Sequence, residues 1–409
     1  MYTRISNSMM TSTFIRDLQR NLSAQYDLQR QISTGKKVQY ASDDPIAADR
    51  ILDYRQTIEK TTQYTKNIND GDSISSHIDL VTANIEDVLL RARDLAVKAS
   101  NEAPNNQQAI DAIAAELDSL LGELVNQANQ SFDGKYLFSG YKSGTIPFTA
   151  ETSLDFVYGS GAVAANGATA LSMPSYTIDG TTRQSEAITD ANSVKAIYVN
   201  GVALNPADYA VDPATNTINI TDVGAAGLNN GDKIEIQFDK VVSVKYTGDS
   251  GTREIEISDG SRVGVSYAGA VSNNSGQSSV FGKYSSSALE TQSVEAFQKI
   301  MDLRDSIYKY TNTGSSNIQD ISRGITDIDD IRTNVTTVRA EQGGRANRLE
   351  LALNRHASVE LFTKEMKKNR EEVDMAEAIS QLVSVQTVYQ AALGAGASII
   401  QTTLLDFLR

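Results

Sequence analysis

The sequence predicts an α+β multidomain protein in which both chain ends form a long α-helical coiled-coil rod and an all-β domain is inserted between them. Near both ends, hydrophobic residues recur at alternating intervals of three and four, the pattern of helices that pack along one seam. Between these ends, residues 141–284 are rich in Gly, Ser, Thr, Asn and Asp and hold short segments of alternating polar and apolar residues, which is typical of β-strands. The length of 409 residues is enough for two or three domains.

The first helix is predicted from a seam that runs from Ile15 to Ile32, and a longer helix follows over residues 46–100. At 1.5 Å per residue the second helix is about 80 Å long, which favours an extended rod. The stretch "STGKKVQYASDDPIAAD", residues 33–49, separates the two helices. Gly35 can adopt the left-handed conformation that ends a helix, Asp43 or Asp44 can cap the next one, and Pro45 suits its first position. We therefore interpret the paired carboxylates as helix caps rather than as an acid–base pair.

The remaining helices follow the same logic. The segment "NEAPNN" at 101–106 contains a proline and polar turn residues, so it should close the long helix, and the heptads over 110–124 should then run antiparallel to it. Heptads over 318–353 and a terminal heptad from Ile379 to Phe407 complete the C-terminal half.

The outermost seams carry Gln, Thr and Gly among their apolar residues, which makes them too weak to hold an isolated helical hairpin. We expect neighbouring subunits to complete them. The predicted assembly seam consists of Leu18, Leu22, Ile32, Ile379, Leu382, Tyr389, Leu393, Ile400 and Phe407.

The middle of the chain predicts β-hairpins and short strands. "REIEIS" and "RVGVSY" flank Asp259–Gly260, a strong hairpin signal, and "KAIYVNG", "TINI" and "DKIEIQF" indicate further strands. Residues 192–238 could form a small β-sandwich of their own, because turn signals recur there every eight to ten residues. The whole module interrupts the helical pattern, so we expect it to contribute nothing to the core of the rod.

The composition and motifs argue against an enzyme. The chain has no cysteine, which excludes disulfides, thiolate zinc sites and thiol nucleophiles. His77 and His356 are the only histidines, and no zinc-protease, P-loop or serine-hydrolase motif occurs. "DIDD" at 327–330 lacks the glycine and distal glutamate of a calcium loop and is interpreted as a solvated helix face. We predict no catalytic residues, no cofactor and no metal.

The net charge and the hydropathy of the chain limit the classes of partner. A net charge of −14 without a long basic run argues against nucleic acid. No apolar stretch reaches the roughly 18 residues of a membrane span, and the first residues lack the apolar core of a secretory signal peptide. We therefore expect no membrane insertion and no cleaved signal.

Two motifs at opposite ends resemble one family. "ISTGKKVQYASDDPIAADR" is similar to the N-terminal signature of bacterial flagellins and their junction relatives, and "RAEQGGRANRLELAL" with "NREEVDMAEAISQLVSVQTVYQAAL" resembles the C-terminal rod of that family. The resemblance covers about residues 1–140 and 285–409. It implies a terminal helical assembly domain of residues 1–42 and 375–409, a coiled-coil rod domain of 43–140 and 285–374, and an inserted β domain of 141–284. It also implies terminal segments that are mobile in the monomer and ordered on assembly.

Within the family, "FDGKYLFSGYKSGTIPF", "VSVKYTGDSGTREIEISDG" and the closing "TTLLDFLR" resemble the members at the hook–filament junction more than filament flagellin. The resemblance implies a structural adaptor in the extracellular flagellum that assembles with copies of itself in a helical ring. It also implies contacts with another hook-associated protein and flagellin, and export by the flagellar type III apparatus with a cytoplasmic chaperone. The alternatives are a filament flagellin and, from another class, a secreted carbohydrate-binding protein or carboxylate enzyme.

Overall fold

The computed structural model divides the chain into two compact units, one of Met1–Lys66 with Leu353–Arg409 and the other of Asn67–Ala352. We call them unit 1 and unit 2. The division into a terminal domain, a rod domain and an inserted β domain, which was expected from the sequence, stays a prediction. The structure describes residues 7–102, 107–157, 170–172, 175–178, 181–184, 188, 190, 192–213, 215–220, 231–272, 278–284, 294–313 and 318–407.

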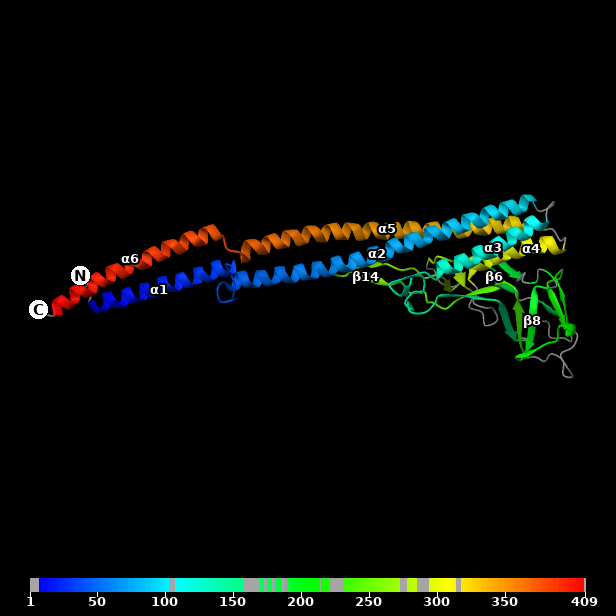
Figure 1. The fold of residues 1–409 in the computed structure, drawn as a ribbon, viewed down its shortest axis with the longest axis horizontal. Helices are drawn as coiled ribbons and strands as arrows, with labels where there is room; N and C mark the ends of the chain where they lie inside the picture. The colour runs from blue at the N-terminus through cyan, green and yellow to red at the C-terminus, as the bar shows by residue number, and fades with distance from the viewer. Residues whose placement is uncertain are drawn as a thin grey trace. The chain divides into compact units, whose positions relative to one another are not determined.

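The helices occupy both chain ends, as the heptads predict (Figure 1). They are α1 (Asn7–Thr34), α2 (Pro45–Glu102), α3 (Gln107–Ala128), α4 (Glu295–Thr313), α5 (Ile318–Glu371) and α6 (Met375–Phe407). The 58 residues of α2 make a helix about 87 Å long. Both α2 and α5 extend through the two units.

The caps predicted between α1 and α2 are present. Gly35 has a φ of 70°, the left-handed conformation that ends α1. Asp44 accepts hydrogen bonds from the backbone N–H groups of Ile46 and Ala47 at 3.1 and 3.0 Å, and Pro45 is the first residue of α2. Asp44 is therefore the residue that caps α2. Its neighbour Asp43 accepts hydrogen bonds from the loop before α2 instead.

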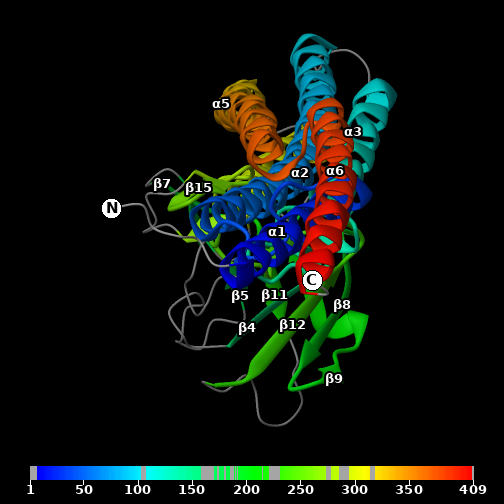
Figure 2. The same cartoon turned by 90° about the vertical axis from the view of Figure 1, so that its left-hand side faces the viewer.

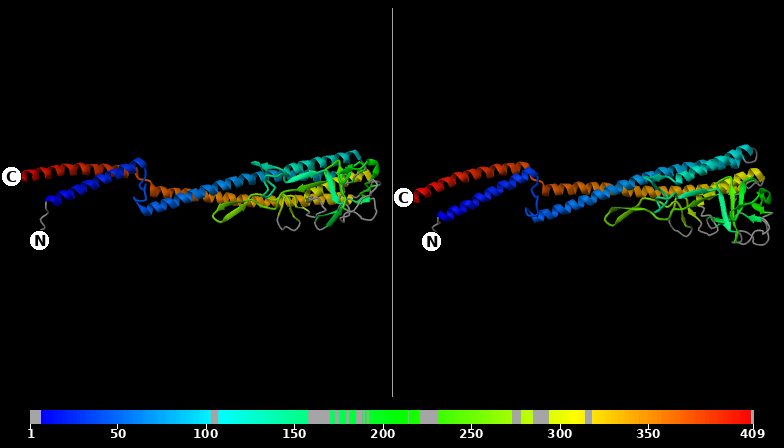
Figure 3. Two further views of the ribbon diagram at one scale, coloured as in Figure 1. Left: turned by 90° about the horizontal axis from the view of Figure 1, so that it is seen from below. Right: turned by 60° about the horizontal axis from the view of Figure 1, so that its bottom comes forward.

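In unit 1, α1 packs beside α6 (Figure 1), and both views of Figure 3 keep the two helices together. The parts of α2 and α5 that belong to this unit bury polar side chains between them. Thr61, His356 and Thr363 are all buried, and the His356 ring packs beside Tyr64 with 5.4 Å between ring centroids. The histidine therefore has a packing role.

In unit 2, one hydrophobic core joins α2, α3, α4 and α5. Ion pairs outside this core link the two long helices. Arg339 of α5 pairs with Asp79 and Glu86 of α2 at 3.1 and 2.7 Å, and Arg93 of α2 pairs with Asp329 of α5 at 2.8 Å. These contacts set the register of α2 against α5.

The strands lie between α3 and α4 in the sequence. They are β1 (Ser131–Phe132), β2 (Lys135–Tyr136), β3 (Phe148–Glu151), β4 (Ser153–Val157), β5 (Ala170–Ser172), β6 (Ser175–Ile178), β7 (Thr181–Gln184), β8 (Val194–Val199), β9 (Val202–Ala203), β10 (Tyr209–Asp212), β11 (Thr217–Ile220), β12 (Lys233–Phe238), β13 (Ser243–Tyr246), β14 (Glu254–Ser258), β15 (Ser261–Gly264), β16 (Val271–Ser272) and β17 (Lys283–Tyr284). The predicted Asp-Gly turn joins β14 to β15, with Gly260 at φ 69°.

The part of the insert nearest the helices shares their core. Phe148 contacts Tyr246, Phe281 and Phe297 with ring centroids 5.1 to 5.3 Å apart, and Phe297 belongs to α4. All four side chains are buried in the same cluster as the helix residues. The expectation that the insert contributes nothing to the core of the rod is therefore wrong for this part. The helical pattern could not reveal it, because the aromatic residues come from segments far apart in the sequence.

The outer part of the insert has its own hydrophobic cluster. A sheet in the order β4-β12-β8-β9 and a second in the order β10-β11-β5 enclose it, and Figure 2 shows the first four strands side by side. The cluster extends from Leu154 to Val242, beyond the 192–238 segment singled out in the sequence. Its two connections to the rest of unit 2 run next to each other, because β4 pairs with β12 and β3 pairs with β13.

A buried group of charges fastens these connections to the helices. Lys240, just after β12, donates to Asp305 Oδ1 of α4 at 2.7 Å, and Arg304 donates to the same oxygen at 2.8 Å. Arg304 is fully buried and also binds Asp118 of α3 at 2.6 Å and the carbonyl oxygen of Val241 at 2.8 Å. Since each charge has partners, the group holds the outer part against α3 and α4 without an unpaired buried ion.

Candidate assembly interface

The α1–α6 pair brings together part of the predicted assembly seam. Leu18, Ile32, Leu382 and Tyr389 are half-buried. Leu22, Ile379 and Leu393 are exposed, at 37%, 47% and 46%. Ile400 and Phe407 belong to α6, but their side chains lie outside the described residues.

Sequence reasoning missed Phe14. It is half-buried against Gly396 of α6, whereas Ile15, which opened the predicted heptad, is 48% exposed. A Cβ atom at Gly396 would lie 2.4 Å from the Phe14 ring, so glycine permits the close approach of the two helices. The heptad that faces α6 is Phe14, Leu18, Asn21, Gln25, Leu28 and Ile32, all half-buried. The residues of this heptad alternate at intervals of four and three. The sequence therefore contained this heptad as well as the one that begins at Ile15.

Each helix of the pair also carries an exposed apolar stripe. On α1, Ile15, Leu22 and Tyr26 are 48%, 37% and 64% exposed, and at 100° per residue they fall within about 40° of one another. On α6, Ile379, Val383 and Leu393 are 47%, 56% and 46% exposed. Exposed apolar residues aligned in this way are candidates for contact with a further helix or protein.

Polar contacts hold the two helix breaks near this pair. Asp43 accepts the backbone N–H groups of Tyr40 and Gln39 at 3.0 and 3.1 Å and pairs with Arg30 at 3.1 Å, and these contacts lower the pKa of its carboxyl group. Asp374 caps α6 by accepting the N–H groups of residues 376 and 377 at 2.9 and 3.2 Å. Each new helix thus starts from a defined cap.

The charges of the chain are unevenly divided. Unit 1 contains 16 Lys and Arg against 14 Asp and Glu, a net charge of +2. Unit 2 contains 21 against 37, a net charge of −16. Copies of unit 1 can therefore approach one another without strong repulsion, and the acidity of the chain is confined to unit 2.

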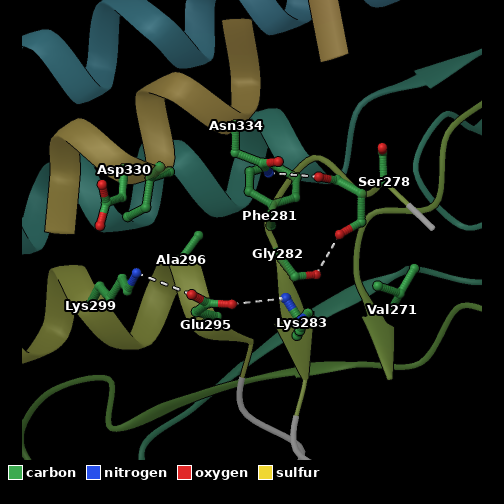
Figure 4. A pocket seen from close by; sticks show the side chains of 12 residues that line it. Val271, Ser278, Phe281, Gly282, Lys283, Glu295, Ala296, Lys299, Asp330 and Asn334 are labelled. Carbon is green, nitrogen blue, oxygen red and sulfur yellow. Dashed lines mark hydrogen bonds and ion pairs between the residues drawn. The ribbon is translucent and has the colours of Figure 1, made fainter. Parts of the chain in front are cut away.

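A cavity of about 320 Å³ in unit 2 lies between α4, α5 and the segment 278–283 (Figure 4). Two of the charged side chains that line it pair with each other. Lys299, almost fully buried, pairs with Glu295 at 3.1 Å and with Asp327 at 3.7 Å, and Glu295 also accepts the N–H group of Lys283 at 3.2 Å. Asn334 donates to the carbonyl oxygens of residues 279 and 280 at 2.7 and 2.9 Å. The polar groups thus fasten the segment to the helices.

The same contacts correct the interpretation of the "DIDD" motif. Asp327 is only 5% exposed, and Asp329 pairs with arginines of α2 and α5. Only Asp330 is exposed. The motif is therefore partly buried rather than a solvated face, because α4 places Lys299 beside it.

Within the described ranges, no group of three acidic or histidine side chains is placed to hold a metal ion. His77 packs beside Phe132 with ring centroids 5.3 Å apart. Of the helices in these ranges, none combines the length and hydropathy of a membrane span.

Comparison with known proteins links both chain ends to one family. The model of the bacterial flagellin N-terminal helical region matches residues 5–143, and the model of the bacterial flagellin C-terminal helical region matches residues 325–408. These matches of 139 and 84 residues together exceed half of the 409-residue chain. They include α1, α2 and α3 at one end and most of α5 and all of α6 at the other.

Individual relatives agree with this match. Flagellar hook-associated protein 3 of Escherichia coli K12 is 30% identical over 149 residues, which is 36% of this chain and 47% of the relative. Flagellin of Salmonella typhimurium LT2 is 32% identical over 104 residues, 25% of this chain and 21% of the relative. The chain thus spans about half the length of the hook-associated relative. A solved structure of a putative flagellar hook-associated protein from Vibrio parahaemolyticus covers 81% of this chain and 100% of its own, with 16% identity and a TM-score of 0.47.

Proposed function

The chain belongs to the bacterial flagellin family, and we propose that it is a structural component of the flagellum, the adaptor at the hook–filament junction on which the filament grows. One observation carries the proposal. The helices that pair in unit 1, α1 and α6, come from the two family-matched ends and leave apolar stripes uncovered. Such stripes suit a subunit that becomes fully packed only within an assembly.

The junction role is favoured over filament flagellin by the match to the hook-associated relative, which has 30% identity over 47% of that relative, whereas the flagellin of Salmonella rubislaw has 25% identity over 42% of its length. The quoted motifs around residues 132–148 and 242–260 support the same choice. Filament flagellin remains the alternative, since both proteins share the two terminal regions.

The partners follow from this role. The α1–α6 surface, including the predicted seam from Leu18 to Phe407, packs against further copies of the chain in a helical ring. The preceding hook-associated protein lies on one side of that ring and flagellin on the other. Export uses the flagellar type III apparatus, a cytoplasmic chaperone holds the C-terminal region before export, and the assembled protein is extracellular.

The protein is proposed to be a structural protein rather than an enzyme. Its relatives are named flagellar hook-associated protein 3 and flagellin, and in the cavity of unit 2 Lys299 pairs with Glu295 and Asp327. A carbohydrate-binding or hydrolytic β domain would be supported instead by a positive glycan array or hydrolase screen on the purified chain.

Deletion of the gene, followed by electron microscopy and analysis of the medium, tests the proposal. The adaptor role predicts cells with hooks, no filaments and flagellin monomers in the medium. Deletion of a filament flagellin would leave hooks without secreted flagellin. Recovery of the chain in purified hook–basal bodies is expected, and a deletion strain that still grows filaments would refute the junction role.

A further inference from the structure

We propose that Glu371 locks the break between α1 and α2 to the break between α5 and α6, so that the two joints bend as a single hinge. This inference does not depend on the proposed function. It rests on the contacts of Glu371, the last residue of α5. Its side chain contacts three cations, and the backbone around it is hydrogen-bonded to the connection between α1 and α2.

The carboxylate of Glu371 is the centre of the joint. Its Oε1 accepts hydrogen bonds from Arg55 of α2 at 2.6 Å and from Lys36, just after α1, at 2.8 Å. Lys367, one turn earlier on α5, lies 3.4 Å from Oε2. The Glu371 side chain is only 6% exposed, whereas those of Lys36 and Arg55 are 43% and 44% exposed. One buried acceptor is thus shared by cations from both sides of the α1–α2 break.

The backbone joins the same two breaks. The N–H group of Lys37 donates to the carbonyl oxygen of Glu371 at 2.8 Å, and the N–H group of Val373 donates to that of Gly35 at 3.1 Å. Lys36 and Glu372 form an antiparallel β-bridge between these bonds. The two connections, more than 330 positions apart in sequence, therefore lie in a fixed register.

Separating the breaks would take Lys36 and Arg55 away from a carboxylate that is only 6% exposed and leave it with Lys367 of its own helix, which is more costly than losing an exposed ion pair. Burial alone would raise the pKa of Glu371, but the hydrogen bonds from Lys36 and Arg55 outweigh it and keep the pKa below its ordinary value. The group is therefore ionised at neutral pH. Gly35 provides the backbone freedom at one joint, and the carboxylate makes the second joint follow.

Hydrogen exchange measured by mass spectrometry tests the coupling. In Glu371→Gln we expect peptides covering 35–44 and 369–376 both to exchange about tenfold faster, since bonds to a charged acceptor are lost. Glu372→Gln is the matched control, because its side chain is 56% exposed and its ion pair with Lys368 is 4.0 Å long. It should change neither peptide, and peptides over 110–124 should be unchanged in both variants.

The reciprocal variant distinguishes a coupled hinge from local loosening. Lys36→Gln replaces an exposed residue that the fold tolerates, and it should accelerate exchange over 369–376 as well as over 35–44. Acceleration confined to the mutated side in either variant, or equal effects of Glu371→Gln and Glu372→Gln, would overturn the proposal.

Discussion

Replacing Leu393 by Asp places a charge in the exposed apolar stripe of α6. If this stripe packs against neighbouring subunits, the substitution should block assembly while the single chain stays folded. The two effects can be separated because Leu393 is 46% exposed in the single chain.

The magnitudes follow from that exposure. Full burial of a leucine side chain is worth about 1.5–3 kcal/mol, so the half that is already buried contributes about 1 kcal/mol to the single chain. Assembly would bury the other half and, in the variant, an unpaired carboxylate, at a cost of several kcal/mol per contact. A cost of about 4 kcal/mol lowers an association constant about a thousandfold.

The assay combines motility, flagellin in the medium and export of the variant itself, because the chaperone is proposed to bind the same region. We expect lost motility and leaked flagellin with the variant protein exported and helical. Ser384→Asp is the matched control. It adds the same charge to an exposed position of α6 nine residues earlier, about 180° around the helix, and should swim normally. An exported Leu393→Asp protein that supports normal swimming would refute the assignment of this stripe.

Three further predictions concern unit 2. Replacing residues 154–237 by an Asn-Gly turn should leave the helical circular dichroism signal of the rest intact, since this segment supplies all of the outer cluster except Phe238 and Val242; broad loss of that signal would contradict the division. Gly344→Ala should raise the free energy of unfolding by about 0.5–1 kcal/mol, because nothing lies within 4 Å of the added Cβ. Gly324→Ala in the same helix should lower it by about 1–3 kcal/mol, because its Cβ would lie 2.7 Å from a leucine of α4; denaturant titration compares the two. Asp155 faces Glu235 across β4 and β12, and burial and this neighbour raise its pKa, so the folded state is penalised as pH rises through that pKa. Asp155→Asn should therefore stabilise the protein by about 0.2–1 kcal/mol at pH 7 and by less in acid, as thermal unfolding at both pH values would show.

Features set by neighbouring residues were predictable from the sequence. The break at residues 33–49, the cap before Pro45 and the hairpin at Asp259–Gly260 depend on backbone conformations and hydrogen bonds within a few positions. The membership of both ends in helices was equally clear, because heptads repeat over long stretches. These features are local, because they form without contacts between residues far apart in the sequence.

The choice between competing stripes was not predictable in the same way. On α1, the spacing from Phe14 and the spacing from Ile15 are both compatible with a helix–helix seam. The structure turns the Phe14 stripe toward α6, where Gly396 leaves room for the ring, and leaves the Ile15 stripe exposed. The selection depends on the shape of a helix that lies some 380 residues later in the chain.

By itself, the sequence determined that this protein has helical ends, an inserted β region and the terminal motifs of one family, since periodicity and local turn chemistry are written in adjacent residues. Only the tertiary structure decided which side chains are buried. It joined Phe148 to the helix core, buried Asp327 beside Lys299 and gathered Lys36 and Arg55 around Glu371. Burial and ion pairing depend on distances between segments remote in sequence, and those distances exist only once the chain has folded.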